Sequence, residues 1–272
     1  MSTNNNILVY DNSCPMCSGY TKLFVRAGLL TIAGRISFSE INPDMLGQID
    51  PVRSKNEIPL LNLSTHEVRY GIHAMVYLIE QKYSWIGTIY RIQPIHWFLH
   101  TLYKFISFNR RVIVAPKETS GFNCAPDFNL LYRLLFMAIF LLFNTMMLYP
   151  VYAVVLQHSY FNGSSITQFQ ILHLALIAVN IIAALTLAGG KWVEYLGQVN
   201  MLALTVILLI LPLIFLNHFF TSPGLNNSYL CCLGIFTVRE YARRMRYARV
   251  WNNHPLIVIN GLSILFFLMY LL

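Results

Sequence analysis

The sequence predicts an α/β domain at the N-terminus, followed by an all-α transmembrane domain of about five helices. Three observations predict this division. The charge distribution breaks near residue 130, the second half contains long uncharged stretches, and the first half alternates short apolar runs with helical spacing. We expect an α/β domain over residues 1–118, a linker over residues 119–130 and a transmembrane domain over residues 131–272.

The two halves differ sharply in charge. Residues 1–129 carry 12 Lys or Arg and 9 Asp or Glu, whereas residues 130–272 carry only 7 and 2. Uncharged stretches of 57, 44 and 23 residues cover Leu134–Gly190, Tyr195–Val238 and residues 250–272. Because a helix needs about 20 apolar residues to cross a bilayer, these lengths fit two spans, two spans and one span. The lipid bilayer is therefore an expected partner.

We expect spans near residues 131–156, 168–188, 195–216, 225–240 and 255–272. The fourth is doubtful, because its wholly apolar part, Tyr229–Phe236, is short. Asn144, Asn180, Gln198 and Asn200 lie within the spans, where amides join helices by hydrogen bonds.

Basic residues predict the topology. A loop after the fourth span is expected to hold five arginines, Arg239, Arg243, Arg244, Arg246 and Arg249. Such loops are cytoplasmic, and the first residues lack the positive and apolar regions of a signal peptide. We expect an integral protein of a cytoplasmic or inner membrane, with the N-terminal domain cytosolic and Leu272 outside. Five of the basic residues behind the net charge of +8 lie in this one loop next to the membrane, so we do not expect a nucleic-acid partner.

The first half reads as a defined order of elements. A strand over Ile7–Tyr10 is followed by turn residues and then by helical spacing from Cys14 to Ala27. A strand over 36–40, a short helical connection, strands over 58–63 and 66–70 and a helix over 72–82 follow. This β-α-β, then β-β-α order is typical of a thioredoxin-like fold.

A Cys-x-x-Cys pair, Cys14 and Cys17, stands between the first strand and the first helix. Half of a zinc site has the same spacing, but a zinc ribbon needs a second pair, and Cys124 and the adjacent Cys231 and Cys232 do not supply one. The position directly after a strand and at the start of a helix favours redox chemistry.

The motifs of this half resemble those of the DCC thiol-disulfide oxidoreductases. The family's Asp-x-x-Cys-x-x-Cys motif matches Asp11–Cys17, its Gly-x-Asp-Ala stretch resembles Gly71–Ala74, and its closing Tyr…Asn-Arg element resembles Tyr103 with Asn109–Arg111. The resemblance covers about the first 115 residues and implies a thioredoxin-like fold. Asn12 stands where the family has Gly, and His73 stands where it has Asp.

Each candidate site residue has an expected role. Cys14, at a helix N-terminus that stabilises a thiolate, is expected to attack, and Cys17, shielded one turn deeper, to resolve. Asp11 either accepts a proton from Cys17 or only caps the turn into the helix. Pro59 starts a strand at the same sheet edge; the fold predicts a cis Ile58–Pro59 bond against the pair, and the alternative is an ordinary trans proline.

These features predict a membrane-anchored thiol-disulfide oxidoreductase whose Cys14–Cys17 dithiol faces the cytosol. Its substrate would be a protein or small-molecule thiol or disulfide. The alternative is a non-catalytic membrane scaffold or complex subunit whose domain binds a partner or senses redox state. We expect no cofactor, because phosphate-binding and nucleotide motifs are absent. We also expect no metal: His96 and His100 are four residues apart on a predicted helix, but no third ligand is evident. Packing of that helix on the membrane or on the core explains the two histidines better.

Overall fold

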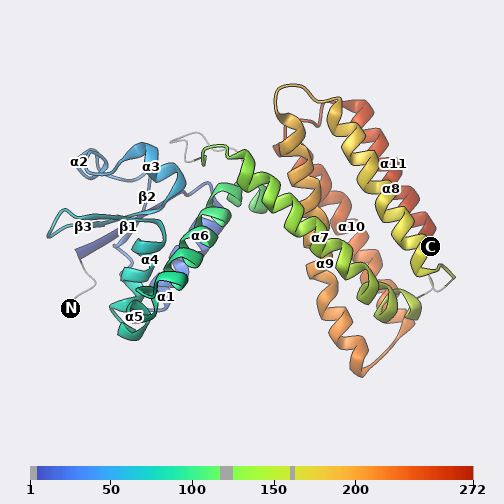
Figure 1. Ribbon diagram of the computed structural model, residues 1–272, viewed down its shortest axis with the longest axis horizontal. Helices are drawn as coiled ribbons and strands as arrows, with labels where there is room; N and C mark the ends of the chain where they lie inside the picture. Colours follow the sequence, from blue (N-terminus) through green and yellow to red (C-terminus); the bar gives the residue numbers. More distant parts are fainter. Residues whose placement is uncertain (1–4, 117–124, 160–162, 272) are drawn as a thin grey trace. The chain divides into compact units, whose positions relative to one another are not determined.

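The structure, a computed structural model, describes residues 5–116, 125–159 and 163–271, so part of the expected linker lies outside the described residues. The chain divides into two compact units, Met1–Tyr132 and Arg133–Leu272 (Figure 1). The first unit combines a small sheet with helices, and the second is helical.

A four-stranded mixed sheet forms the centre of the first unit. The strands are β1 (Asn6–Tyr10), β2 (Arg35–Ser37), β3 (Pro59–Asn62) and β4 (Val68–Tyr70), in the spatial order β2-β1-β3-β4. β1 pairs with β2 in parallel and with β3 antiparallel, and β3 pairs antiparallel with β4. All five residues of β1 are buried, as its central place in the sheet requires.

Six helices accompany the sheet in the described part of this unit: α1 (Pro15–Arg26), α2 (Pro43–Leu46), α3 (Pro51–Asn56), α4 (Gly71–Glu80), α5 (Ser84–Tyr90) and α6 (Gln93–Val114). The element order predicted through α4 is confirmed, with α2 and α3 as the short helical connection. The β3–β4 turn forms where Asn62 accepts hydrogen bonds from the N–H groups of Ser64 and Thr65.

Successive residues of β1 enter different cores because side chains alternate across a strand. Leu8 and Tyr10 pack in a cluster that holds both cysteines and buried residues of α4. Ile7 and Val9 pack on the other face, beside residues of the β2–α3 region. The cysteine pair therefore belongs to the core face that α1 and α4 cover (Figure 1).

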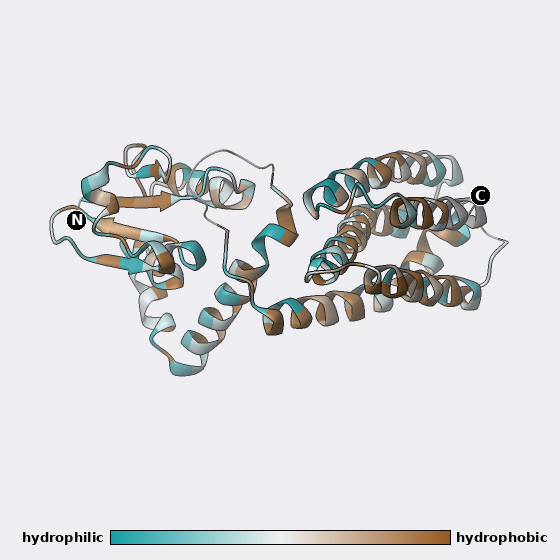
Figure 2. Ribbon diagram, turned by 90° about the horizontal axis from the view of Figure 1, so that it is seen from above, coloured by the Kyte–Doolittle hydropathy of each residue, from teal (hydrophilic) through white to brown (hydrophobic). Residues whose placement is uncertain are grey.

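The second unit contains α7 (Leu130–Val154, which starts in the first unit), α8 (Ile166–Leu185), α9 (Lys191–Phe219), α10 (Pro223–Tyr247) and α11 (His254–Leu271). Three helical segments among the described residues are long and apolar enough to cross a membrane: Leu130–His158, Ile166–Leu185 and Lys191–Phe219. Figure 2 colours these helices largely as hydrophobic. The membrane-capable character predicted for this half is confirmed for these three.

The remaining two expected spans correspond to α10 and α11, and five crossings stay a prediction. The expected arginine loop is wrong in one respect, because α10 continues through Arg239, Arg243, Arg244 and Arg246 to Tyr247. Glu240 forms ion pairs with Arg243 at 2.6 Å and Arg244 at 2.9 Å, and such i,i+3 and i,i+4 pairs stabilise continued helix.

Amide side chains join the helices of the second unit, as the sequence predicted. Asn144 donates to the Oδ1 atom of Asn200 at 3.2 Å, and Asn200 donates to the carbonyl of Met137 at 2.9 Å. The hydroxyl of Tyr195 donates to Asn180 at 2.6 Å. In a bilayer such bonds hold helices together, because lipid offers no competing partner.

Candidate functional site

Cys14 is the N-cap residue of α1. It follows the short turn after β1 in an extended conformation, and its Sγ accepts a hydrogen bond from the backbone N–H of Cys17 at 3.4 Å. Pro15 occupies the first helical position, where no N–H is left without a partner. The Cys14 sulfur thus takes the place that a capping oxygen usually holds, next to the positive end of the helix dipole.

The two thiols have opposite pKa shifts. A hydrogen bond from the Cys17 side chain, the Cys17 N–H and the charge of Arg110 together overcome burial and lower the pKa of Cys14 to about 6. The same thiol–thiol hydrogen bond, together with burial, raises the pKa of Cys17 well above its usual value. These opposite shifts make Cys14 the more acidic of the two thiols. The attacking role of Cys14 and the resolving role of Cys17 stay predictions.

Both cysteines are buried, which the sequence did not predict. Cys17 is 4% exposed, so it is shielded as expected, but Cys14 is only 1% exposed and is shielded as well. Both pack in one cluster with Tyr10, Ile58 and Ala74. The burial arises because α1 lies with its first turn on the sheet, beneath side chains from segments distant in the sequence.

Asp11 is buried close to the cysteine pair, and its two carboxylate oxygens have different surroundings. Its Oδ1 accepts hydrogen bonds from the backbone N–H of Ser13 at 2.9 Å and the hydroxyl of Ser13 at 2.5 Å. Its Oδ2 accepts no hydrogen bond and lies 3.9 Å from the guanidinium of Arg110. Oδ1 therefore shapes the turn, while Oδ2 keeps capacity to accept a proton, so both alternatives for Asp11 have a structural basis.

Arg110, on α6, is a site residue to which sequence reasoning gave no role. Its side chain is buried, and the attraction of Cys17, Cys14 and Asp11 raises its pKa against the opposing effect of burial. A cavity of about 10 Å³ is lined by Asp11, Cys17 and Arg110 among others. That volume is close to the minimum that one water molecule needs.

The Ile58–Pro59 bond is not cis, because the described residues contain no cis peptide bond. The expected cis geometry is therefore wrong, although antiparallel pairing of β3 with β1 does place the start of β3 at the edge where β1 ends. The predicted role of Pro59 in catalysis stays a prediction. As the first residue of a strand, a trans Pro59 fits without a lost hydrogen bond.

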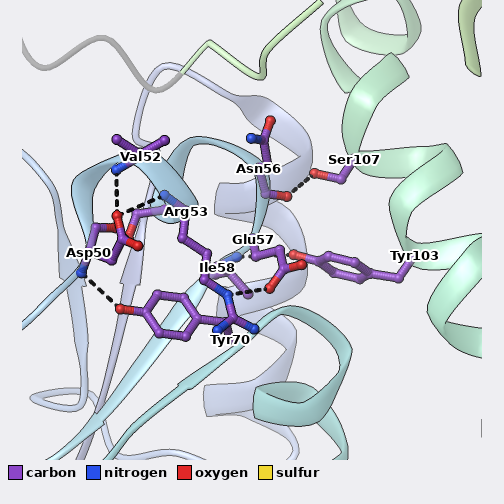
Figure 3. A network of polar contacts seen from close by, with 10 residues as sticks. Asp50, Val52, Arg53, Asn56, Glu57, Ile58, Tyr70, Tyr103 and Ser107 are labelled. Carbon is purple, nitrogen blue, oxygen red and sulfur yellow. Dashed lines mark hydrogen bonds and ion pairs between the residues drawn. The ribbon is translucent and has the colours of Figure 1, made fainter. Parts of the chain in front are cut away.

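The backbone of Ile58 is also not free to bind a substrate. Its N–H donates to the hydroxyl of Tyr103 at 3.0 Å (Figure 3). Its carbonyl accepts from the N–H of Gly71 at 2.9 Å. One turn further along α6, Ser107 donates to the carbonyl of Asn56 (Figure 3). These two hydrogen bonds therefore hold the segment before β3 against α6.

The partly buried Tyr103 and the buried Ser107 and Arg110 form a polar stripe on α6. Their spacing of four and three residues places them on one helix face, so helical periodicity was a signal that could have found them. Gly71 makes room for this stripe: it has φ +61°, and a Cβ there would lie 3.0 Å from the Tyr103 ring. Gly71, Tyr103 and Arg110 belong to the motifs by which the sequence resembles the DCC family, but the sequence assigned them no role.

The structure brings His73 beside His96 and His100. The ring centroid of His73 lies 5.3 Å from that of His96 and 6.0 Å from that of His100, and its Nδ1 lies 3.1 Å from the Tyr90 hydroxyl. Even so, no group of three or more His, Cys, Asp or Glu side chains among the described residues is arranged to hold a metal ion.

Comparison with known proteins identifies the region that contains this site. Residues 8–115 match the family described as DCC1-like thiol-disulfide oxidoreductase. The match includes both cysteines, Asp11, Tyr103 and Arg110, and it ends before the helices of the second unit. No curated protein and no solved structure matches the chain.

Proposed function

We propose that this chain, whose residues 8–115 match the DCC1-like thiol-disulfide oxidoreductase family, exchanges disulfides through Cys14 and Cys17 while anchored in a membrane. The observation that carries the proposal is the position of the Cys14 sulfur as the cap of α1, with a pKa of about 6. The sheet order β2-β1-β3-β4, with the pair at the start of the first helix, supports a thioredoxin-like fold.

The exchange proceeds in two steps. The Cys14 thiolate attacks one sulfur of a substrate disulfide, forms a mixed disulfide and releases the other substrate sulfur as a thiolate. Cys17 then loses its proton and attacks the Cys14 sulfur, which closes the Cys14–Cys17 disulfide and releases the second substrate thiolate. The substrate gains two electrons, and the pair loses two.

The second step needs a group that accepts the Cys17 proton, because the pKa of Cys17 is raised. Asp11 is the proposed acceptor, since its Oδ2 has no hydrogen-bond partner and lines the same small cavity as Cys17. One water in that cavity would carry the proton between them. The guanidinium of Arg110 lies 3.9 Å from Asp11, and its charge stabilises the Cys14 thiolate.

Access sets a condition on the substrate. Because Cys14 is buried and both backbone groups of Ile58 are already paired, a partner does not bind by adding a strand at Ile58. A protein or small-molecule disulfide reaches Cys14 only after side chains that cover it move. We propose no cofactor for the exchange.

We propose that the first unit faces the cytosol of a cytoplasmic or inner membrane. The argument is the concentration of arginines near the end of α10, because basic segments stay on the cytoplasmic side. Reporter fusions after residue 129 and after Leu272 test it. A cytosolic reporter at residue 129 and an external one at Leu272 support five crossings, and an external reporter at residue 129 overturns the orientation.

The experiment that tests the exchange is trapping with Cys17→Ser in native membranes. Without a resolving thiol, the mixed disulfide on Cys14 persists, so we expect adducts that dithiothreitol releases. The matched control is the double variant Cys14→Ser with Cys17→Ser, which should carry none at this site. Equal adducts in both proteins, or none in either, would contradict the proposal.

The burial of both cysteines favours a second candidate, a membrane scaffold or complex subunit whose first unit binds a partner. The same pair of variants separates the two candidates. If the unit only binds, a partner co-purifies equally with the wild type, with Cys17→Ser and with Cys14→Ser, and no reducible adduct forms.

A further inference from the structure

Helices α5 and α6 expose a face of large apolar side chains on the first unit. This α5–α6 face consists of Trp85, Ile89, Trp97, Phe98, Leu102 and Ile106. Trp97 is 68% exposed and Phe98 is 58% exposed, although both are large apolar side chains. Contiguous apolar surface of this kind marks a place where something else binds.

The two helices keep this face separate from the core. On α6, Phe98, Leu102 and Ile106 repeat every four residues and form one stripe, whereas the polar stripe with Tyr103 and Arg110 is turned toward the sheet. The apolar stripe therefore lies on a different side of α6 from the polar stripe, with Leu102 39% exposed and Ile106 37% exposed. It is a second, outward-facing apolar surface on an otherwise ordinary amphipathic helix.

The charge around the face identifies its occupant. From residue 81 to residue 109 the sequence contains three Lys or Arg, Lys82, Arg91 and Lys104, and not one Asp or Glu. Arg91 follows α5 directly, and Lys104 lies on α6 between Phe98 and Ile106. Tryptophan with flanking basic residues is typical of helices that lie in the interface of an anionic lipid bilayer, where the rings enter the headgroup region and the cations contact phosphates.

The chain itself keeps this face near a membrane. α6 ends at Val114, and Leu130 begins the first helix that is long and apolar enough to cross a bilayer. The 15 intervening residues, even fully extended, span at most about 55 Å. A bilayer is thus always within reach, and a weakly binding face is sufficient because its local concentration is high.

We propose that the α5–α6 face is a membrane-binding surface that lies in the interface of an anionic lipid bilayer. One face of α6 then contacts lipid while its neighbouring face holds Tyr103 and Arg110 beside the cysteine pair. Docking of α6 on the bilayer therefore fixes the orientation of the pair with respect to the membrane surface. The proposal goes beyond disulfide exchange and does not depend on it.

Fluorescence of a single tryptophan in the full-length protein tests the proposal. Trp85→Phe, Trp192→Phe and Trp251→Phe leave Trp97 as the only tryptophan, and the protein is placed in nanodiscs of phosphatidylcholine with phosphatidylglycerol, with or without brominated acyl chains. We expect brominated lipid to reduce Trp97 emission at least about twofold, because an interfacial ring lies within reach of the acyl chains.

A matched control places the reporter elsewhere on the same unit. Ile32 is 83% exposed and lies outside the α5–α6 face, so Ile32→Trp in a chain without other tryptophans should be quenched by aqueous acrylamide and not by brominated lipid. Circular dichroism of both proteins checks that they fold. The lipid quenching of Trp97 should weaken when phosphatidylcholine alone replaces the anionic mixture. It should also weaken in the double variant Arg91→Gln with Lys104→Gln. The double variant Lys22→Gln with Arg26→Gln, which removes two charges from α1, should leave it unchanged.

Three outcomes would overturn the proposal. Trp97 quenched by acrylamide and not by brominated lipid would show that the face stays in water. Trp97 protected from both quenchers in a monomeric protein would show that other parts of the chain cover it. Protection from both quenchers that disappears on dilution would show that a second copy covers it.

Discussion

The guanidinium of Arg110 lies 3.9 Å from the carboxylate of Asp11, and both side chains are buried beside the Cys14–Cys17 pair. The two residues come from opposite ends of the first unit's sequence, the turn after β1 and the end of α6. One cation therefore faces two groups that carry negative charge, Asp11 and the Cys14 thiolate. Breaking such a buried pair by removing one partner is costly, because the other charge is left uncompensated.

Removing the guanidinium should raise the pKa of Cys14. Arg110 lowers that pKa by Coulombic attraction, so Arg110→Met should shift it upward by about one unit or more. Arg110→Lys, which keeps the charge, should shift it less. The rate of Cys14 alkylation as a function of pH measures both variants, and an unchanged profile in Arg110→Met would show that Arg110 does not act on the thiolate.

Cys14 and Cys17 should differ in reactivity with pH. With a pKa of about 6, Cys14 is mainly thiolate above pH 6 and mainly thiol below it, so its iodoacetamide rate should rise through pH 6 to a plateau. Cys17 should react slowly between about pH 5 and pH 9, because its raised pKa keeps it protonated. Mass spectrometry after short pulses separates the two. Faster alkylation of Cys17 would reverse the assigned roles.

Local sequence patterns were sufficient for the elements that place the pair. The apolar run of β1, the turn residues at Asp11 and the helical spacing after Cys14 are all short-range signals, and they predicted that Cys14 starts a helix. The uncharged stretches likewise predicted the membrane-capable helices, because composition alone decides whether a helix is apolar enough.

Long-range contacts were beyond the reach of the sequence. The approach of Tyr103 and Arg110 to the pair depends on how α6 packs. Their spacing shows that they share one face of a helix, but it does not show that this face lies against the cysteine pair. The same kind of contact explains why the backbone of Ile58 is not free to bind a substrate and why Cys14 is buried. Tyr103 and Gly71 occupy the backbone groups of Ile58, and the cluster around Tyr10 and Ile58 covers Cys14.

Gly71→Ala should destabilise the first unit. Gly71 has φ +61°, which an L residue adopts with strain, and the new Cβ would lie 3.0 Å from the ring of Tyr103. We expect a loss of about 1–3 kcal/mol in the free energy of unfolding. Gly19→Ala is the matched control, because nothing lies within 4 Å of its Cβ position in α1, and it should stabilise by about 0.5–1 kcal/mol. Chemical denaturation of both variants decides, and equal effects would contradict the geometry at Gly71.

Tyr103→Phe should expose the segment before β3 to solvent exchange. The variant removes the hydroxyl that accepts the N–H of Ile58, and an unpaired N–H there costs about 1–3 kcal/mol. Hydrogen exchange of peptides that contain Ile58 should accelerate. Tyr83→Phe is the control, since Tyr83 is an exposed tyrosine outside this network, and it should leave the same peptides unchanged. Unchanged exchange in Tyr103→Phe would show that the hydroxyl does not hold this segment.

The central claim is that Cys14 and Cys17 interconvert between dithiol and disulfide, and a redox titration tests it most directly. The full-length protein is equilibrated with mixtures of reduced and oxidised glutathione, and free thiols are counted by alkylation and peptide mapping. Cys231→Ser with Cys232→Ser removes the exposed vicinal cysteines as a control. We expect a single two-electron transition that joins Cys14 to Cys17 and is unchanged in the control. A pair that stays as two thiols at every potential, while the protein remains folded, would contradict the account.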